Sequence, residues 1–209
     1  MQIEMQIEGS ALAVERGGRI IFTNIGFRLA AGEALLVTGP NGAGKSSLLR
    51  AIAGLLPLAE GQITVAPTSE ARLPELCHYV GHADALKPSL TVYENLAFWA
   101  AFLTSGAAKG GSEEGIEAAL AQLGLTRIAD LPAAYLSAGQ KRRAALARLL
   151  AVYRPLWLLD EPGTALDAAS QKVLGAIMLG HLDAGGMIIA ATHAPLGLPA
   201  RELVLGRAA

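Results

Sequence analysis

The sequence has few cysteines, no excess of positive charge and no long apolar run, and each of these absences excludes some classes of protein. Its one cysteine, Cys77, excludes a disulfide within the chain and suits a reducing compartment. Lysine and arginine number 17 against 18 aspartates and glutamates, so there is no electrostatic case for nucleic acid as a partner. No apolar run approaches the roughly 18 residues that a membrane span needs. The first residues lack the basic and apolar regions of a signal peptide, which favours the cytoplasm.

Apolar residues, by contrast, are abundant. They make up 52% of the 209 residues, and the mean hydropathy is +0.40. This richness indicates either a large core or an apolar surface that a partner covers. The length suits one sizeable domain, and we expect a single domain over residues 1–209 with a mostly helical insert at about 83–150.

Strand and helix patterns alternate along most of the chain, which predicts an α/β fold with a mostly parallel sheet and an N-terminal antiparallel layer. We expect strands at 12–14, 19–22, 25–29, 34–38, 61–65, 76–80, 156–159 and 187–190, with a hairpin turn at Gly17-Gly18. We expect helices at 47–53, at about 91–103 with Thr91 as N-cap, at 113–123 and at 138–152, and a loop at 104–112.

A glycine-rich segment joins the strand at 34–38 to the following helix. It consists of Gly39, Pro40, Asn41, Gly42, Ala43, Gly44, Lys45 and Ser46, with Ser47 next in the chain. This fits G-x-x-x-x-G-K-S, in which the backbone N–H groups and the helix N-terminus hold nucleotide phosphates. Lys45 would contact the β- and γ-phosphates and Ser46 would bind Mg²⁺. The loop alone leaves kinases, GTPases and motor ATPases open.

Two carboxylates follow the apolar strand at 156–159. Asp160 would reach Mg²⁺, through water, and Glu161 would act as general base on an attacking water molecule. The alternative is a strand that simply ends in an acidic turn. Because the same chain carries a phosphate-binding loop before this strand, the catalytic interpretation is favoured.

The segment Leu136-Ser137-Ala138-Gly139-Gln140 precedes that strand at the start of a helix. The order of G-x-x-x-x-G-K-S, L-S-x-G-Q and four apolar residues plus Asp-Glu resembles the ATP-binding-cassette (ABC) ATPases, from about Leu12 to Val204. The resemblance implies a P-loop NTPase core with an antiparallel β layer and a helical subdomain. It also implies a homodimer that sandwiches ATP. Ser137, Gly139 and Gln140 of one subunit would then face ATP bound to the other.

The same resemblance assigns further residues. His193 matches the switch histidine, against the alternative of an ordinary surface or core histidine, and Thr164-Ala165-Leu166-Asp167 matches the D-loop. His82 stands where the family usually has a glutamine that touches Mg²⁺ and water, which puts its role there in question. Arg16 stands where an aromatic usually stacks on adenine. A guanidinium can stack on a base, and a solvated turn arginine is the alternative.

Two other groups invite interpretation. Cys77, His78 and His82 suggest a metal or haem site, but no C-x-x-C-H motif is present, and a structural role for His78 is favoured. Lys141-Arg142-Arg143 is either a phosphate or lipid patch or, as we expect, a solvated helix face.

The Gly81-His82 pair and the sequences that follow Ser46 and Gln140 resemble the branch of ABC ATPases that serves cytochrome c maturation and haem export. That resemblance implies a position at the cytoplasmic face of the inner membrane, an integral membrane permease partner of the CcmB type, and haem-handling membrane proteins beyond it. Tyr93, Phe98, Trp99 and Phe102 would contact the permease, or fill an ordinary helical core. An ABC transporter for another substrate and a soluble non-transport ABC ATPase remain alternatives.

Overall fold

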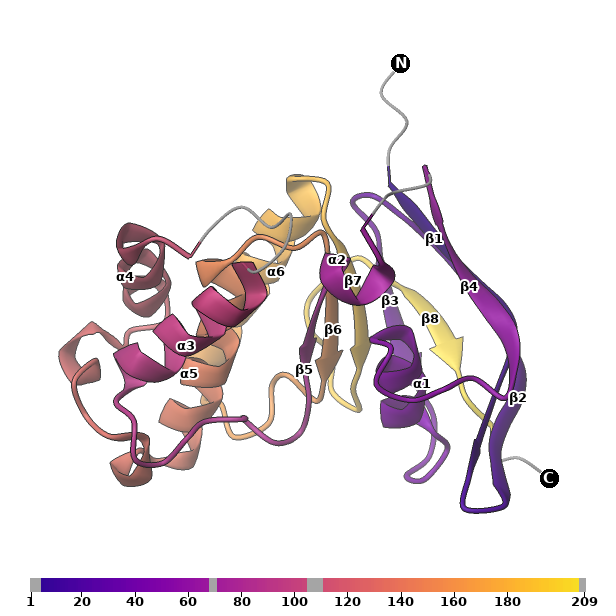
Figure 1. Ribbon diagram of the computed structural model, residues 1–209, viewed down its shortest axis with the longest axis horizontal. Coiled ribbons are helices and arrows are strands. Elements are labelled where there is room, and N and C mark those ends of the chain that lie inside the picture. The colour runs from indigo at the N-terminus through magenta and orange to yellow at the C-terminus, as the bar shows by residue number, and fades with distance from the viewer. Residues whose placement is uncertain (1–4, 68–70, 105–110, 207–209) are drawn as a thin grey trace.

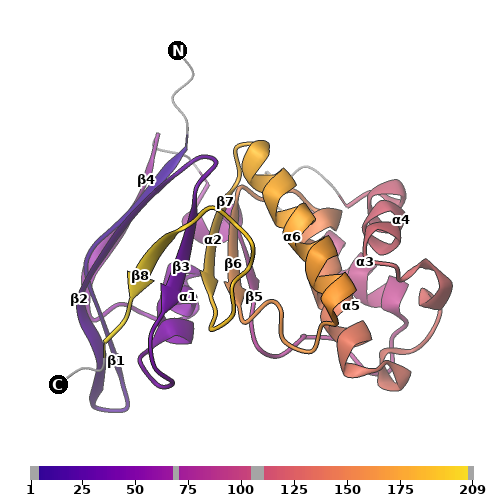
Figure 2. The ribbon, with the colours of Figure 1, turned by 180° about the vertical axis from the view of Figure 1, so that it is seen from behind.

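The computed structural model describes residues 5–67, 71–104 and 111–206, and it is built in layers. A central parallel sheet has helices α3, α4, α5 and α6 on one side, and helix α1 with an antiparallel sheet on the other (Figure 1). The view from behind shows the same order, with α1 between the two sheets (Figure 2). This is the fold class that the sequence predicts.

The antiparallel sheet contains β1 (Gln6–Arg16), β2 (Arg19–Ala30) and β4 (Glu60–Ala66) in the order β2-β1-β4. The predicted hairpin is confirmed, since Gly17 and Gly18 connect β1 to β2 with φ of 60° and 74°. The sequence suggests two runs at 19–22 and 25–29. The structure has one strand, because Asn24 takes a positive φ of 53° and the irregular pairing absorbs the break.

The central sheet is parallel throughout. Its strands β3 (Ala34–Thr38), β5 (Cys77–Val80), β6 (Leu156–Asp160), β7 (Met187–Ala191) and β8 (Arg201–Val204) lie in the order β5-β6-β7-β3-β8. The carboxyl ends of parallel strands meet at one edge, which is where α/β sheets bind ligands. The loops that follow β3, β5, β6 and β7 therefore converge.

The structure has helices α1 (Lys45–Ile52), α2 (Leu73–Leu76), α3 (Val92–Thr104), α4 (Glu113–Gln122), α5 (Ala138–Ala151) and α6 (Ala168–Asp183), with short 3₁₀ turns at Thr126–Ile128 and Ala133–Tyr135. Helices α3, α4, α5 and α6 begin at a Ser, Thr or Asp N-cap, whereas α1 follows a glycine without a side-chain cap. The predicted cap of α3 is confirmed, because Thr91 Oγ1 accepts from the Glu94 N–H at 3.0 Å. Asp167 caps α6 through the Ser170 N–H at 2.7 Å.

Some boundaries differ from those that the sequence predicts. Leu76 ends helix α2 and does not begin the strand, because Pro74 suits a first helical turn. Thr104 still belongs to α3, and residues 105–110 of the expected loop lie outside the described residues. Helix α6 and strand β8 are absent from the sequence-based assignment.

Two hydrophobic clusters lie on opposite faces of the parallel sheet. Alternate strand residues point to opposite faces, so Trp157 and Leu159 join the cluster under helices α3–α6, whereas Leu156 and Leu158 join the cluster around α1 and the antiparallel sheet. Strand β7 divides in the same way. The sheet therefore separates two cores.

Three arginines cover the outer edge of β5. Arg154 donates to the Cys77 carbonyl at 2.8 Å, Arg148 to the Tyr79 carbonyl at 2.9 Å, and Arg142 to the Gly81 carbonyl at 2.8 Å. The acceptors are every second residue, as expected for carbonyls that point away from β6. Burial lowers the pKa of Arg148 to about 10. These side chains provide the hydrogen bonds that a further strand would otherwise make.

The expectation of a solvated face at Lys141-Arg142-Arg143 is therefore wrong. Arg142 is only 3% exposed, and Arg143 donates to the Leu123 carbonyl at 2.9 Å. Arg142 and Arg143 thus act as donors to backbone carbonyls, a role for which the guanidinium, with up to five N–H donors, is well suited.

His78 has the structural role that the sequence favours. It is buried in β5, and its Nε2 lies 2.7 Å from the Val152 carbonyl. Burial lowers the pKa of its imidazole to about 3 and raises that of the neighbouring Cys77 thiol to about 11. Both groups are therefore uncharged near neutral pH. Across the residues that the structure describes, no helix is long and apolar enough to cross a bilayer.

Candidate active site

An open cleft of about 300 Å³ lies at the carboxyl edge of the parallel sheet. Its lining comes from the β3–α1 loop and the first turn of α1, the end of β6, the loops after β5, β6 and β7, and one residue of β2. The lining residues are Ile21, Asn41, Gly42, Gly44, Lys45, Ser46, Ser47, His82, Asp160, Glu161 and His193. The structure thus brings together most of the site residues that the sequence singles out, from positions more than 100 residues apart.

The β3–α1 loop needs its glycines for two different reasons. Gly39 has a φ of 127°, and a Cβ there would lie 2.2 Å from the Leu205 carbonyl oxygen. Gly42 has a φ of 82° with open space around it, so only its backbone conformation requires glycine. Gly44 precedes α1 with a φ of 98° and offers no side-chain cap, so the first N–H groups of α1 stay available for an anion.

Lys45 is held within this loop. It is 8% exposed, and its Nζ donates to the carbonyls of Gly39 at 2.8 Å and Pro40 at 3.1 Å. The same Nζ lies 3.0 Å from His193 Nε2, which in turn is 2.9 Å from Asn41 Oδ1. The lysine ammonium thus lies beside the free N–H groups of α1, and the two together favour a bound anion.

Two carboxylates face this positive region. Asp160 ends β6 and is 4% exposed, and its carboxylate takes no hydrogen bond from the residues that the structure describes. Glu161 follows, with its Oε1 3.8 Å from His193 Nε2. Glu161 has a φ of 48°, which is strained for a side chain of this size. Its backbone N–H donates to the Ala191 carbonyl at 2.8 Å, which ties it to the end of β7.

The oxygens that could hold a metal ion are few. No group of three or more His, Cys, Asp or Glu residues within the described part of the chain forms a metal cage. Ser46 and Asp160 do line the same cleft. One or two protein oxygens beside phosphate groups suit Mg²⁺, which keeps several water ligands.

Two predicted residues lie differently with respect to the cleft. His82 lies two residues after the end of β5 and is exposed on the cleft wall. Arg16 is exposed at the end of β1 opposite Arg19, and it does not line the cleft. Its contact with adenine stays a prediction. From the neighbouring strand Ile21 lines the cleft instead, and it could not be found from the sequence because an isoleucine in a strand carries no chemical signal.

The Ser137–Gln140 segment lies outside this cleft. Ser137 Oγ accepts from the Gln140 N–H at 3.2 Å, and Gln140 Oε1 accepts from the Ser137 N–H at 2.8 Å, a capping box at the start of α5. A Cβ on Gly139 would lie 2.9 Å from the Ala165 carbonyl oxygen, so this helix start packs closely against the turn before α6. Ser137 is exposed to solvent.

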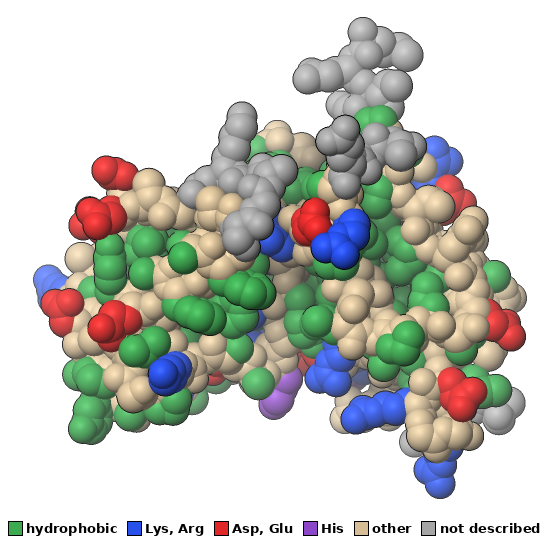
Figure 3. Space-filling view, in the orientation of Figure 1, with side chains coloured by type: hydrophobic (Ala, Val, Ile, Leu, Met, Phe, Trp, Pro, Cys, Tyr) green, Lys and Arg blue, Asp and Glu red, His purple; other side chains and the backbone are tan. Residues whose placement is uncertain are grey.

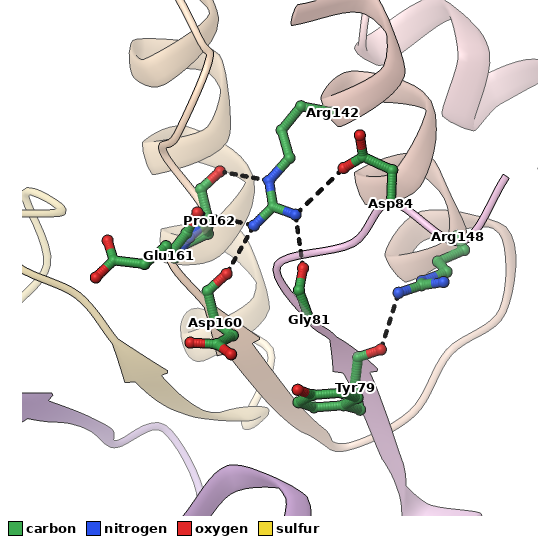
Figure 4. Close-up of polar contacts among 8 residues, drawn as sticks. All are labelled: Tyr79, Gly81, Asp84, Arg142, Arg148, Asp160, Glu161 and Pro162. Atoms are coloured by element: carbon green, nitrogen blue, oxygen red, sulfur yellow. Dashed lines mark hydrogen bonds and ion pairs between the residues drawn. The ribbon is translucent and has the colours of Figure 1, made fainter. Parts of the chain in front are cut away.

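Arg142 is a residue that sequence reasoning missed. Its guanidinium donates to backbone carbonyls on both sides of the cleft wall, at Gly81 and at residues 160–162 (Figure 4). A basic run on a helix gives no sign of such contacts, which depend on the turns packed against it.

Comparisons with known proteins agree with this geometry. The ABC transporter family model matches residues 22–164. A cytochrome c biogenesis ATP-binding export protein, CcmA, of Nitrobacter winogradskyi is 55% identical over 206 residues, which is 98% of this chain and 100% of that protein. The protein of the same name from Rhodopseudomonas palustris is 54% identical over 98% of this chain and 100% of its own length. Among solved structures, a putative ABC transporter ATP-binding protein from Pyrococcus furiosus superposes with a TM-score of 0.80 at 23% identity, over 96% of this chain and 97% of that chain, which shows the shared fold. The chain therefore belongs to the ABC transporter family and is one of its ATPases.

Proposed function

We propose that this ATPase is the nucleotide-hydrolysing subunit of a membrane exporter that serves the biogenesis of c-type cytochromes. The observation that carries the proposal is the cleft in which Lys45, Asp160, Glu161 and His193 converge. The cytochrome c biogenesis function rests on the name carried by relatives about 55% identical over nearly their whole length. Residues 1–209 would form one nucleotide-binding domain.

Within the cleft we assign roles from chemistry and position. The residues from Gly39 to Ser47 hold the ATP phosphates, and Lys45 exchanges its loop carbonyls for phosphate oxygens. Glu161 accepts the proton of the attacking water, and His193 orients the γ-phosphate from the opposite side. His82 lies on the wall beside them and contacts water or phosphate. When bound by Ser46 and Asp160, Mg²⁺ would neutralise charge on the phosphate oxygens. Arg16 would contact adenine.

The working unit is a homodimer. Ser137, Gly139 and Gln140 are absent from the cleft of their own chain, yet Ser137 is exposed at a helix N-terminus. A second copy can bring this surface to the γ-phosphate, so ATP would join the two subunits. Hydrolysis would remove the shared phosphate and loosen the dimer.

The membrane partner would contact α3. Phe98 and Phe102 are 57% and 60% exposed, and their rings stack at 6.3 Å, with Trp99 edge-on to both. Figure 3 shows hydrophobic side chains on the surface of this half of the molecule. Tyr93 is half-buried and lines a separate pocket against α4. We assign this face to an integral membrane permease of the CcmB type, in contact with haem-handling proteins, at the cytoplasmic face of the inner membrane. Nucleic acid is not a partner in this proposal.

The first experiment measures Mg-dependent ATP hydrolysis by the purified chain and by Glu161→Gln. The variant should lose at least about 100-fold in kcat and, with ATP, should elute from a sizing column as a dimer. Full activity in Glu161→Gln would refute the assigned base.

The second experiment separates the cytochrome function from the alternatives. Cells that carry Glu161→Gln as their only copy should lose covalently haem-containing c-type cytochromes, and the wild-type chain should co-purify with a membrane protein. Normal c-type cytochromes with a different lost transport activity would favour an exporter or importer of another substrate. No membrane protein at all would favour a soluble ABC ATPase.

A further inference from the structure

One buried side chain, Arg142, joins its own helix α5 to two other segments that the site needs. Ser137 is the N-cap of this helix, and Arg142 itself is 3% exposed. Its Nη2 donates to the carbonyls of Asp160 and Glu161, each at 2.8 Å. Its Nε donates to the Pro162 carbonyl at 3.3 Å. Figure 4 shows these bonds gathering around the guanidinium plane.

The same guanidinium reaches the segment after β5. Its Nη1 donates to the Gly81 carbonyl at 2.8 Å and lies 3.4 Å from Asp84 Oδ1. His82 lies between these two acceptors in the chain and lines the cleft. Arg142 therefore holds the backbone just before His82 and the side chain of Asp84 just after it, as well as the backbone carbonyl of Glu161.

Glu161 needs such bracing more than its neighbours do. Its φ of 48° is costly for a residue with a Cβ, and such a conformation persists only where the surroundings impose it. The Ala191 carbonyl holds its N–H, and Arg142 holds its carbonyl. Without the guanidinium, the peptide that follows Glu161 can rotate toward an unstrained conformation and carry the carboxylate away from the cleft.

We propose that Arg142 is a positioning residue for ATP hydrolysis, which acts by holding Glu161 and the segment around His82 in their cleft-facing positions. The proposal rests on the assignment of Glu161 as the base. The hydrolysis rate would then also depend on the positions of α5 and residues 81–84, because the rigid guanidinium of Arg142 joins both to the turn at 160–162.

Kinetics of Arg142→Gln test this idea. A glutamine cannot span the two segments, so kcat should fall about 10- to 100-fold while the KM for ATP changes less than about threefold. Arg148→Gln is the matched control. It removes a buried arginine from the same helix and the same β5 edge, but Arg148 does not reach residues 160–162. Its folded fraction should keep the parental kcat.

A double variant separates positioning from general damage. If Arg142 acts through Glu161, then Arg142→Gln should cause little further loss when it is added to Glu161→Gln, measured by single-turnover hydrolysis over hours. An equal loss in both backgrounds would overturn the proposal, and so would a parental kcat in Arg142→Gln. If Glu161→Gln itself remained fully active, the assigned base would fail first, and the two failures are thus distinguishable.

Should Arg142→Gln fail to fold, Arg142→Lys carries the same test. A lysine keeps the charge and reaches carbonyls on one side only, so its kcat should lie between those of the parent and the glutamine variant. If the folded Arg142→Lys variant kept the parental kcat, simultaneous donation by the guanidinium to both segments would not be needed, which would count against the proposal.

Discussion

At the scale of single residues, the glycines of the β3–α1 loop differ in why they are needed. Both Gly39 and Gly42 have positive φ, but only at Gly39 would a Cβ meet a backbone atom, the Leu205 carbonyl oxygen at 2.2 Å. We expect Gly42→Ala to lower the free energy of unfolding by about 1–2 kcal/mol, from backbone strain alone. Gly39→Ala should cost more than about 3 kcal/mol, because β8 must also shift.

Chemical denaturation without nucleotide, followed by circular dichroism, compares the two variants directly. Equal losses for Gly39→Ala and Gly42→Ala would show that the close approach to Leu205 is not the cause.

A second residue-scale prediction concerns pH. Burial lowers the pKa of His78 to about 3 and that of His181 to about 4, against about 6.5 in an unfolded chain. The unfolded chain therefore binds more protons than the folded one below pH 6.5. Stability should be fully present above that pH and should fall as the pH drops toward 4, by up to about 1.4 kcal/mol per pH unit for each histidine.

Urea denaturation at pH 7.5, 6.0 and 5.0 measures this dependence. His78→Gln keeps a hydrogen-bond donor for the Val152 carbonyl and removes the titration, so its slope below pH 6.5 should be about half that of the parent. A parental free energy of unfolding that stays constant over this range would contradict the prediction.

The sequence predicts site residues well where the chemistry is carried by a motif. The phosphate loop, Asp160 and Glu161 stand beside recognisable strands, and the structure brings them into one cleft. Ile21 and Arg142 could not be found in this way. Their roles arise from what packs against them in three dimensions, and neither an isoleucine in a strand nor an arginine in a basic run signals that.

At the scale of elements, β5 depends on side chains for its outer edge. Arg148 donates to the Tyr79 carbonyl and lies under the Trp99 ring at 4.8 Å, so it joins β5, α5 and α3. Arg148→Met should lower the free energy of unfolding by about 1–3 kcal/mol, since a buried carbonyl loses its donor and the ring loses its cation.

Hydrogen exchange gives the local readout for Arg148→Met. Protection should fall in β5 and α3 and stay unchanged in β1 and β4, which lie on the far side of the molecule (Figure 1). Uniform loss of protection over all strands would indicate a general effect and not an edge effect.

Elements with strong caps and steady periodicity were predictable, and those that depend on tertiary contacts were not. Helix α6 has an N-cap at Asp167, but Gly175 and Gly180 in its interior weaken the helical signal. Strand β8 is four residues long, begins with the charged pair Arg201-Glu202, and forms because β3 offers it an open edge. Neither feature is visible as a local pattern.

At the scale of the whole molecule, the proposed dimer makes a prediction about mixtures. Lys45→Ala alone should be inactive because its phosphate loop fails, and Ser137→Arg alone should be inactive because it cannot complete its partner's site. A heterodimer of the two contains one site with both parts intact, so mixing the proteins should restore hydrolysis.

ATPase rate against mixing ratio is the measurement, with a maximum expected near equal amounts. A mixture as inactive as its components would contradict a site shared between subunits. The control is Lys45→Ala mixed with Glu161→Gln, which places both defects in phosphate-loop halves and should stay inactive.

The separation of the two hydrophobic clusters affects how substitutions combine and how movements are transmitted between the helices and the nucleotide site. Each strand sends alternate side chains to opposite faces, so among the residues that the structure describes the cluster around Leu120 and the cluster around Leu48 have no member in common. Leu120→Ala and Leu48→Ala should then add in their effects on stability to within about 0.5 kcal/mol. A displacement of the helices would therefore reach the nucleotide site through the strand backbone and the arginine hydrogen bonds. Neither hydrophobic core would need to repack for that to happen.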